Sequence, residues 1–108
     1  MQTIEKTALS ELIKNEDYAR TVLPHMRKDY FSDRNERIIF EEIQKFVEKY
    51  NSLPTKSSIE IEIDNRRDLN EQDVKTVLSV IKSLEKDENA NFEWLVETTE
   101  KFCKDKAV

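Results

Sequence analysis

The sequence predicts an all-α fold, a compact bundle of about five to six helices that ends in a helical hairpin. Apolar residues recur at spacings of three and four through most of the chain, which is the period of an amphipathic helix. The 108 residues contain no glycine, so glycine-dependent hairpin turns are unavailable. In the absence of glycine, we expect asparagines to take the left-handed positions after helices: Asn15, Asn51, Asn65 and Asn89.

Two short helices are expected at the start of the chain. The segment 7–14 places four apolar residues at helical spacing: Ala8, Leu9, Leu12 and Ile13. The segment 16–23, EDYARTVL, gives a second short helix, which Pro24 ends or bends. Together these two pieces form a small helical corner.

The clearest helix is expected over residues 34–50. Asp33 followed by Glu36 has the spacing of a capping box, which satisfies the free N–H groups of a first turn. Its apolar residues form one stripe: Ile39, Ile43, Phe46, Val47 and Tyr50.

Residues 59–63, IEIEI, alternate in the way a half-buried strand does. A strand needs a partner, and no other segment of the chain alternates in this way. Ser57 followed by Glu60 has the spacing of a capping box, and Thr55, just after Pro54, is a second candidate cap, so we favour a capped helix. The alternative, an edge strand paired across molecules, remains open at this point.

The last two helices are expected to form an antiparallel hairpin. Asn70 caps the first, with Asp73 in its first turn, and its inner face holds Val74, Val77, Leu78, Ile81 and Leu84. Residues 86–91, KDENAN, form the connection. The last helix runs from Asn91 to the end, with one apolar side: Phe92, Leu95, Val96, Thr99, Phe102 and Cys103.

Composition excludes several classes of function. A net charge of −5 argues against a domain that grips phosphate backbones. A chain without glycine has neither a P-loop nor a dinucleotide fingerprint. His25 is the only histidine, which rules out a histidine cluster, and Cys103 is interpreted as a small core residue. We therefore expect no catalytic residue, no metal site and no cofactor in this chain.

The cysteine count and the sequence of the N-terminus indicate the cellular compartment. One cysteine makes no internal disulfide, and Met1 is not followed by a signal-peptide pattern. No segment approaches the roughly 18 consecutive apolar residues of a membrane span. The chain is expected to be intracellular.

Four apolar residues are predicted to turn away from the buried faces of their helices. At 100° per residue, Ile61 points about 200° away from Ile59. Ile38 and Trp94 lie about 140° from the centres of their stripes, and Val80 lies about 90° off. A single exposed apolar residue is ordinary, but together Ile38, Ile61, Val80 and Trp94 are our candidates for a protein interface.

Three blocks of sequence resemble a known family. They are DYF at 29–31, IIFEEIQKFVEKYNSLPT at 38–55 and WLVETTEKFCKDKA at 94–107, the last being the most specific. The chain resembles the N-terminal domain of DnaB-type replicative hexameric DNA helicases, in the version of T-even-type tailed phages. The resemblance runs from about residue 9 to residue 108. The last helix stops at Val108 without a capping signal, and we expect the natural chain to continue.

The resemblance implies a non-catalytic N-terminal domain over 1–108. In that family such a domain forms a collar, helps to assemble the hexamer and recruits primase, and a helicase loader is a further expected partner. ATP, magnesium and unwinding belong to an ATPase domain that is absent from these residues, and DNA contact is expected to be weak or indirect. The implied setting is the cytoplasm of a phage-infected bacterium. A free-standing acidic phage adaptor or inhibitor of a host protein is the alternative, and a DNA-binding helical domain fits this charge poorly.

Overall fold

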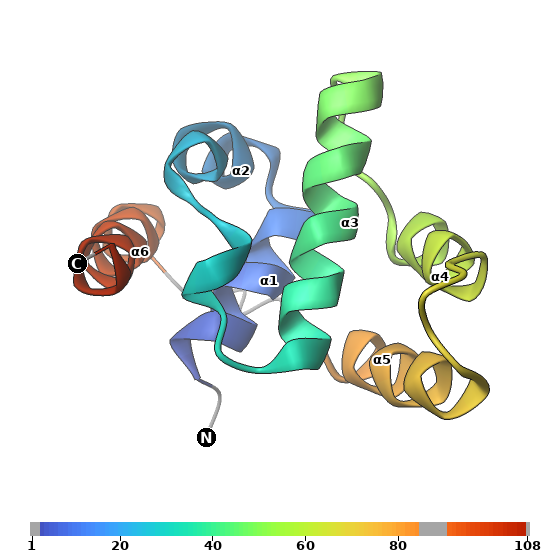
Figure 1. Cartoon of the computed structure of the whole chain (residues 1–108). Coiled ribbons are helices and arrows are strands. Elements are labelled where there is room, and N and C mark those ends of the chain that lie inside the picture. Colours follow the sequence, from blue (N-terminus) through green and yellow to red (C-terminus); the bar gives the residue numbers. More distant parts are fainter. Residues whose placement is uncertain (1–2, 85–90, 108) are drawn as a thin grey trace.

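The computed structural model describes residues 3–84 and 91–107, and within them it is helical without strands (Figure 1). The all-α prediction is therefore confirmed. The elements are α1 (Ile4–Lys14), α2 (Glu16–Val22), η1 (Leu23–His25), η2 (Lys28–Tyr30), α3 (Arg34–Tyr50), α4 (Lys56–Asp64), α5 (Glu71–Ser83) and α6 (Phe92–Lys106), where η marks a 3₁₀ turn. None of these helices is long and apolar enough to cross a membrane.

Helix α3 stands in the middle of the molecule. It packs against α1 on one side and against α4 and α5 on the other (Figure 1). Helix α6 packs on α1 and α2, so it lies on the side of the molecule opposite α5. The predicted hairpin of the last two helices is therefore wrong: each docks on a different half of the described fold.

Side-chain caps place most helix starts where the sequence indicated. The Asp33 carboxylate accepts hydrogen bonds from the backbone N–H groups of Asn35 and Glu36 at 2.7 and 3.2 Å. At α5 the Asn70 side chain accepts from Asp73 N–H at 2.8 Å, and the Asp73 carboxylate accepts from Asn70 N–H at 3.4 Å. Each cap satisfies donors that the first turn of a helix leaves free.

The asparagines behave differently from one another. Asn51, which ends α3, adopts the left-handed conformation with φ 52°. Asn15 is extended with φ −125° and caps α2, and Asn65 is right-handed with φ −87°, so the prediction is wrong for these two. Asn89 lies outside the described residues. A side-chain cap, as at Asn15, replaces the left-handed turn that the missing glycines would supply.

Residues 59–63 are helical, within α4. Thr55 is the cap, and its hydroxyl accepts a hydrogen bond from Ser58 N–H at 3.1 Å. Ile59 and Ile63 are fully buried, whereas 60% of Ile61 is exposed. The alternating pattern of residues 59–63 therefore belongs to a helix with one isoleucine turned outward, and the edge-strand alternative is wrong.

An aromatic cluster joins the two halves of the core. The rings of Phe31 and Phe40 lie 5.1 Å apart between centroids, and Phe31 is 6.0 Å from Phe102 of α6. Tyr30 meets Phe102 edge-on at 6.4 Å. Such offset and edge-on pairs add to the apolar area that they bury. The segment around η2 therefore links α3 to α6.

Candidate protein-interaction surfaces

The four residues predicted at a protein interface have different surroundings. Ile61 and Trp94 are exposed, by 60% and 53%, as expected from helix geometry. Val80 is partly buried against the core. Ile38 is only 6% exposed, so the prediction that it faces outward is wrong. Helix α3 is covered from several sides, and a calculation that assumes one buried stripe misplaces a residue on its flank.

The start of α6 presents two aromatic side chains to solvent. Asn91 caps the helix by accepting a hydrogen bond from Trp94 N–H at 3.0 Å. Phe92, predicted on the inner side, is 43% exposed, which corrects that prediction. Because α6 docks on α1 and α2, the buried line of the helix runs through Leu95, Thr99 and Phe102 instead. Phe92 and Trp94 come before the first residue of this buried line in the sequence and are exposed.

A groove lies between α2 with η1 and the C-terminal end of α3, which Figure 1 shows beside each other. Its volume is about 480 Å³. We call it the α2–α3 groove, and it is lined by Glu16, Ala19, Arg20, Leu23, Pro24, Met26, Gln44, Val47, Glu48, Asn51, Ser52 and Leu53. The sequence-based interface candidates include none of these residues.

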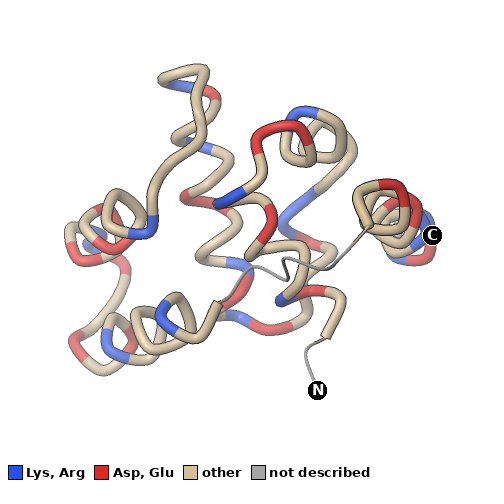
Figure 2. The backbone as a smooth tube through the Cα atoms, turned by 180° about the vertical axis from the view of Figure 1, so that it is seen from behind, with Lys and Arg blue, Asp and Glu red and all other residues tan. Residues whose placement is uncertain are grey.

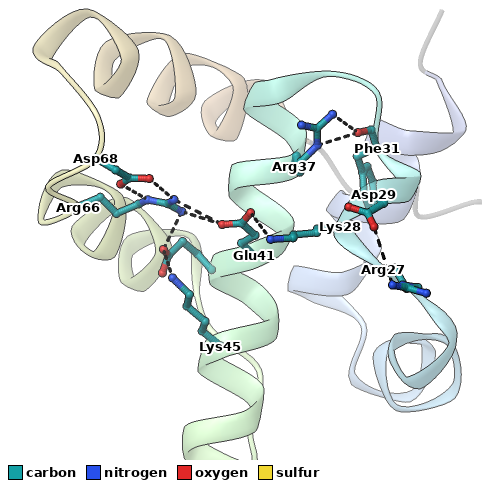
Figure 3. A network of polar contacts seen from close by, with 10 residues as sticks. Arg27, Lys28, Asp29, Phe31, Arg37, Glu41, Lys45, Arg66 and Asp68 are labelled. Atoms are coloured by element: carbon teal, nitrogen blue, oxygen red, sulfur yellow. Dashed lines mark hydrogen bonds and ion pairs between the residues drawn. The ribbon is translucent and has the colours of Figure 1, made fainter.

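A network of charged side chains ties the α4–α5 connection to α3 (Figure 3). Arg66 donates two hydrogen bonds to Asp68, at 2.9 and 2.7 Å, in the bidentate geometry that suits a guanidinium. It also donates to Glu42 at 3.1 Å and to Glu41 at 3.4 Å. The carboxylates of one helix and one loop therefore share a single, largely buried guanidinium.

This network shifts the acidity of its members. The hydrogen bonds from Arg66 lower the pKa of Asp68 to about 2. The same contact with Asp68 raises the pKa of Arg66, so the guanidinium stays charged. Lys28 lies 3.6 Å from Glu41, and Lys45 lies 3.7 Å from Glu42, which adds cations around the two glutamates. The cluster is electrostatically satisfied by its own members, as a structural tie would be.

Three residues of reactive types, His25, Cys103 and Tyr18, lie in different surroundings within the part of the chain that the structure describes. His25 is exposed at η1. Burial raises the pKa of the Cys103 thiol, and this disfavours the nucleophilic thiolate. Tyr18 is buried, and its hydroxyl lies 2.6 Å from that of Thr99. Within residues 3–84 and 91–107, no three His, Cys, Asp or Glu side chains are grouped to hold a metal ion.

Surface charge is mixed. Figure 2 shows lysines and arginines interspersed with aspartates and glutamates along the helices. A surface that grips a phosphate backbone needs clustered positive charge. The arrangement therefore suits contacts with proteins better than contacts with nucleic acid.

Comparison with known proteins bears out the resemblance. The family model of the DnaB-like helicase N terminal domain matches residues 1–92. The DnaB-like replicative helicase of Enterobacteria phage T4 is 28% identical to the chain over 102 residues. The match covers 93% of this chain and 21% of that relative, so the chain spans about a fifth of the relative's length. The chain belongs to the family of DnaB-like helicase N-terminal domains.

Proposed function

We propose that this chain is a non-catalytic interaction domain of a phage replicative helicase, acting in hexamer assembly and in the recruitment of primase. The observation that carries the proposal is the family match over residues 1–92 together with the T4 relative, whose name is that of a replicative helicase. ATP hydrolysis and magnesium binding would belong to a further domain. The proposed site of action is the cytoplasm of the infected bacterium.

The physical character of the chain supports a role in protein binding. Ile61 and Trp94 expose apolar surface that contributes nothing to the core of the described fold. The α2–α3 groove adds a concave, partly apolar site. Exposed apolar patches and grooves are the usual features of protein interfaces. The candidate sites are therefore Ile61 on α4, Trp94 on α6 and the groove, while Val80 is partly buried against the core.

A free-standing adaptor that binds a host protein is the second candidate, and the acidic charge of −5 suits it. The two candidates differ in their genes. A helicase reading frame would continue beyond residue 108 into an ATPase domain with a Walker A motif, whereas an adaptor would end near this residue. Sequencing the reading frame separates them.

Sedimentation velocity of the chain, alone and with the primase of the same phage, tests the leading proposal. We expect either self-association at high concentration or a complex with primase. A strict monomer that also ignores primase would contradict the proposal. A variant that changes exposed Glu100 to Lys serves as a control for non-specific charge effects, because this side chain lies outside the groove and is adjacent in sequence to neither Ile61 nor Trp94.

A further inference from the structure

We propose that the α2–α3 groove binds a basic amphipathic helix of another protein, one that presents apolar side chains beside a lysine or arginine. This inference goes beyond the proposed function, because it names a site and the chemistry of its ligand and does not depend on helicase or primase. The shape of the groove, its apolar lining and the charge of its rim support the inference.

The shape of the groove comes from two helix faces. On α2 the lining residues Glu16, Ala19 and Arg20 are spaced by three and four and so share one face, and Leu23 at the start of η1 follows them. On α3 the residues Gln44, Val47 and Glu48 repeat the same spacing, and Asn51 follows the end of the helix. Two helical ridges with a hollow between them form the kind of groove that accepts the apolar side of a third helix.

The lining of the groove is apolar at depth and polar at the rim. Ala19 and Met26 are buried, while Leu23, Val47 and Leu53 are half-buried and pack against the core. These last three side chains therefore retain apolar surface that a ligand would remove from water. A volume of about 480 Å³ lies within the range of ordinary ligand sites, so the groove has room for the apolar side chains of a short segment.

The charge of the rim selects the ligand. Arg20 is already engaged, because it donates two hydrogen bonds to Glu16 at 3.1 and 2.6 Å. Glu48 is exposed on the opposite wall, and no lysine or arginine of the described residues forms an ion pair with it. The free charge at the rim is thus negative. A positive side chain on the ligand complements it, and charge complementarity of this kind fixes partner choice.

A second copy of this chain is a poor occupant. Exposed Ile61 lies between Glu60 and Glu62, and exposed Trp94 follows Glu93, so either one would bring acid to an acidic rim. Exposed Phe92 also lies beside Glu93. Exposed Tyr50 is already engaged within its own helix, where its ring centroid lies 4.7 Å from that of Phe46 and 5.2 Å from Lys49 Nζ. The sign of the charges therefore favours a different protein.

The test is an NMR titration of the ¹⁵N-labelled chain with a designed helical peptide. The peptide has about 15 residues, enough for a helix, with leucines at i, i+4 and i+7 and flanking lysines. We expect the amide shifts to change at Ala19, Leu23, Val47 and Leu53. Replacing the peptide lysines by glutamates should weaken binding at least about tenfold, and replacing its leucines by alanines should abolish it. Both of these changes leave the chain itself intact.

A charge reversal in the chain makes the test specific. Glu48→Lys should invert the preference, so that the variant binds the glutamate peptide more tightly than the lysine peptide. The matched control is Glu62→Lys, which makes the same charge change outside the groove and should leave the preference unaltered. Glu48 is exposed, so the variant is expected to fold normally, which circular dichroism checks.

Several outcomes would overturn the inference. These are no shift at millimolar peptide, shifts centred on Ile61 or Trp94, an unchanged preference in Glu48→Lys, or a dimer of the chain that is closed through the groove. Failure here is distinguishable from failure of the proposed function. A chain that ignores the peptide yet binds primase removes only the groove inference. If the chain binds the peptide but neither self-associates nor binds primase, only the proposed function is contradicted.

Discussion

The helices on the two sides of α3 are held in place by different kinds of polar contact. On the side of α4 and α5, Arg66 binds Glu41, Glu42 and Asp68, and Arg34 pairs with Asp73 at 3.1 Å. On the side of α1, α2 and α6, a hydrogen bond of 2.6 Å joins two buried hydroxyl groups, that of Tyr18 on α2 and that of Thr99 on α6.

Each half should therefore lose stability under its own conditions of pH. Charged ties weaken when acid neutralises their carboxylates, whereas a buried phenol resists ionisation until strongly alkaline pH. Substitutions in the buried core, in the charged network and at the hydroxyl pair should therefore have effects of different size and different pH dependence.

The largest effect is expected from removing a buried isoleucine. Ile38→Ala should lower the free energy of unfolding by about 2–5 kcal/mol, because it leaves a cavity in the core. Ile61→Ala removes the same atoms from an exposed site and should change the free energy of unfolding by less than about 0.5 kcal/mol. Urea denaturation measures both. Equal losses would mean that Ile38 is not enclosed as the structure shows.

The charged half is broken at its centre by Arg66→Ala. The variant leaves the buried Glu42 carboxylate without its guanidinium, with only Lys45 at 3.7 Å, and we expect a loss of about 2 kcal/mol at neutral pH. The bond from Arg66 lowers the pKa of Asp68 from 3.8 to about 2, so this pair stabilises the fold above pH 3.8. That contribution disappears as the pH falls towards 2.

Acid denaturation measured by circular dichroism follows this loss. Between pH 4 and pH 2 the stability of the wild type should decline more steeply than that of Arg66→Ala. Arg66→Lys keeps the charge but not the planar fork, and should fall between the two. Parallel curves for the wild type and Arg66→Ala would show that the Asp68 pair has no role in the acid response.

The hydroxyl tie is broken by Tyr18→Phe. We expect a loss of about 1 kcal/mol at neutral pH, because the buried Thr99 hydroxyl loses a partner. Burial raises the pKa of Tyr18 from 10.0 to about 12, so an unfolded chain ionises first, and wild-type stability falls as the pH rises from 10 to 12. The variant lacks that decline. If the two proteins respond identically to alkali, Tyr18 is not buried as described.

The smallest effect is expected at the exposed pair of Arg20 and Glu16. Both side chains are more than half exposed, at 64% and 59%, so Arg20→Ala should leave the stability nearly unchanged. The variant is the matched control for Arg66→Ala, since both remove an arginine that contacts a carboxylate. A large loss at Arg20 in thermal unfolding would remove the distinction between surface and buried pairs.

The sequence predicted local structure well because its causes are local. Asn70 and Asp73 set the start of α5, and Thr55 sets the start of α4. The outward position of Ile61 followed from three isoleucines within one helix. Periods and caps depend on residues at most four apart, and a single chain displays them.

Contacts between residues that are far apart in the sequence were not predicted. The burial of Ile38 depends on elements that cover α3 from several sides, and the docking of α6 on α1 and α2 joins the two ends of the chain. The α2–α3 groove combines residues 16–26 with residues 44–53, and no local pattern connects these segments. The spacing of Glu16, Arg20 and Leu23 was the one available signal, but it resembles any exposed helix face.

The measurement closest to the central claim, that this domain acts by binding proteins, is amide hydrogen exchange with and without the primase of the same phage. We expect slower exchange with primase in at least one segment that bears exposed apolar surface: the groove, the helix of Ile61 or the start of α6. Exchange in the core around Phe40 should not change. Identical exchange in every segment at saturating primase would contradict the account.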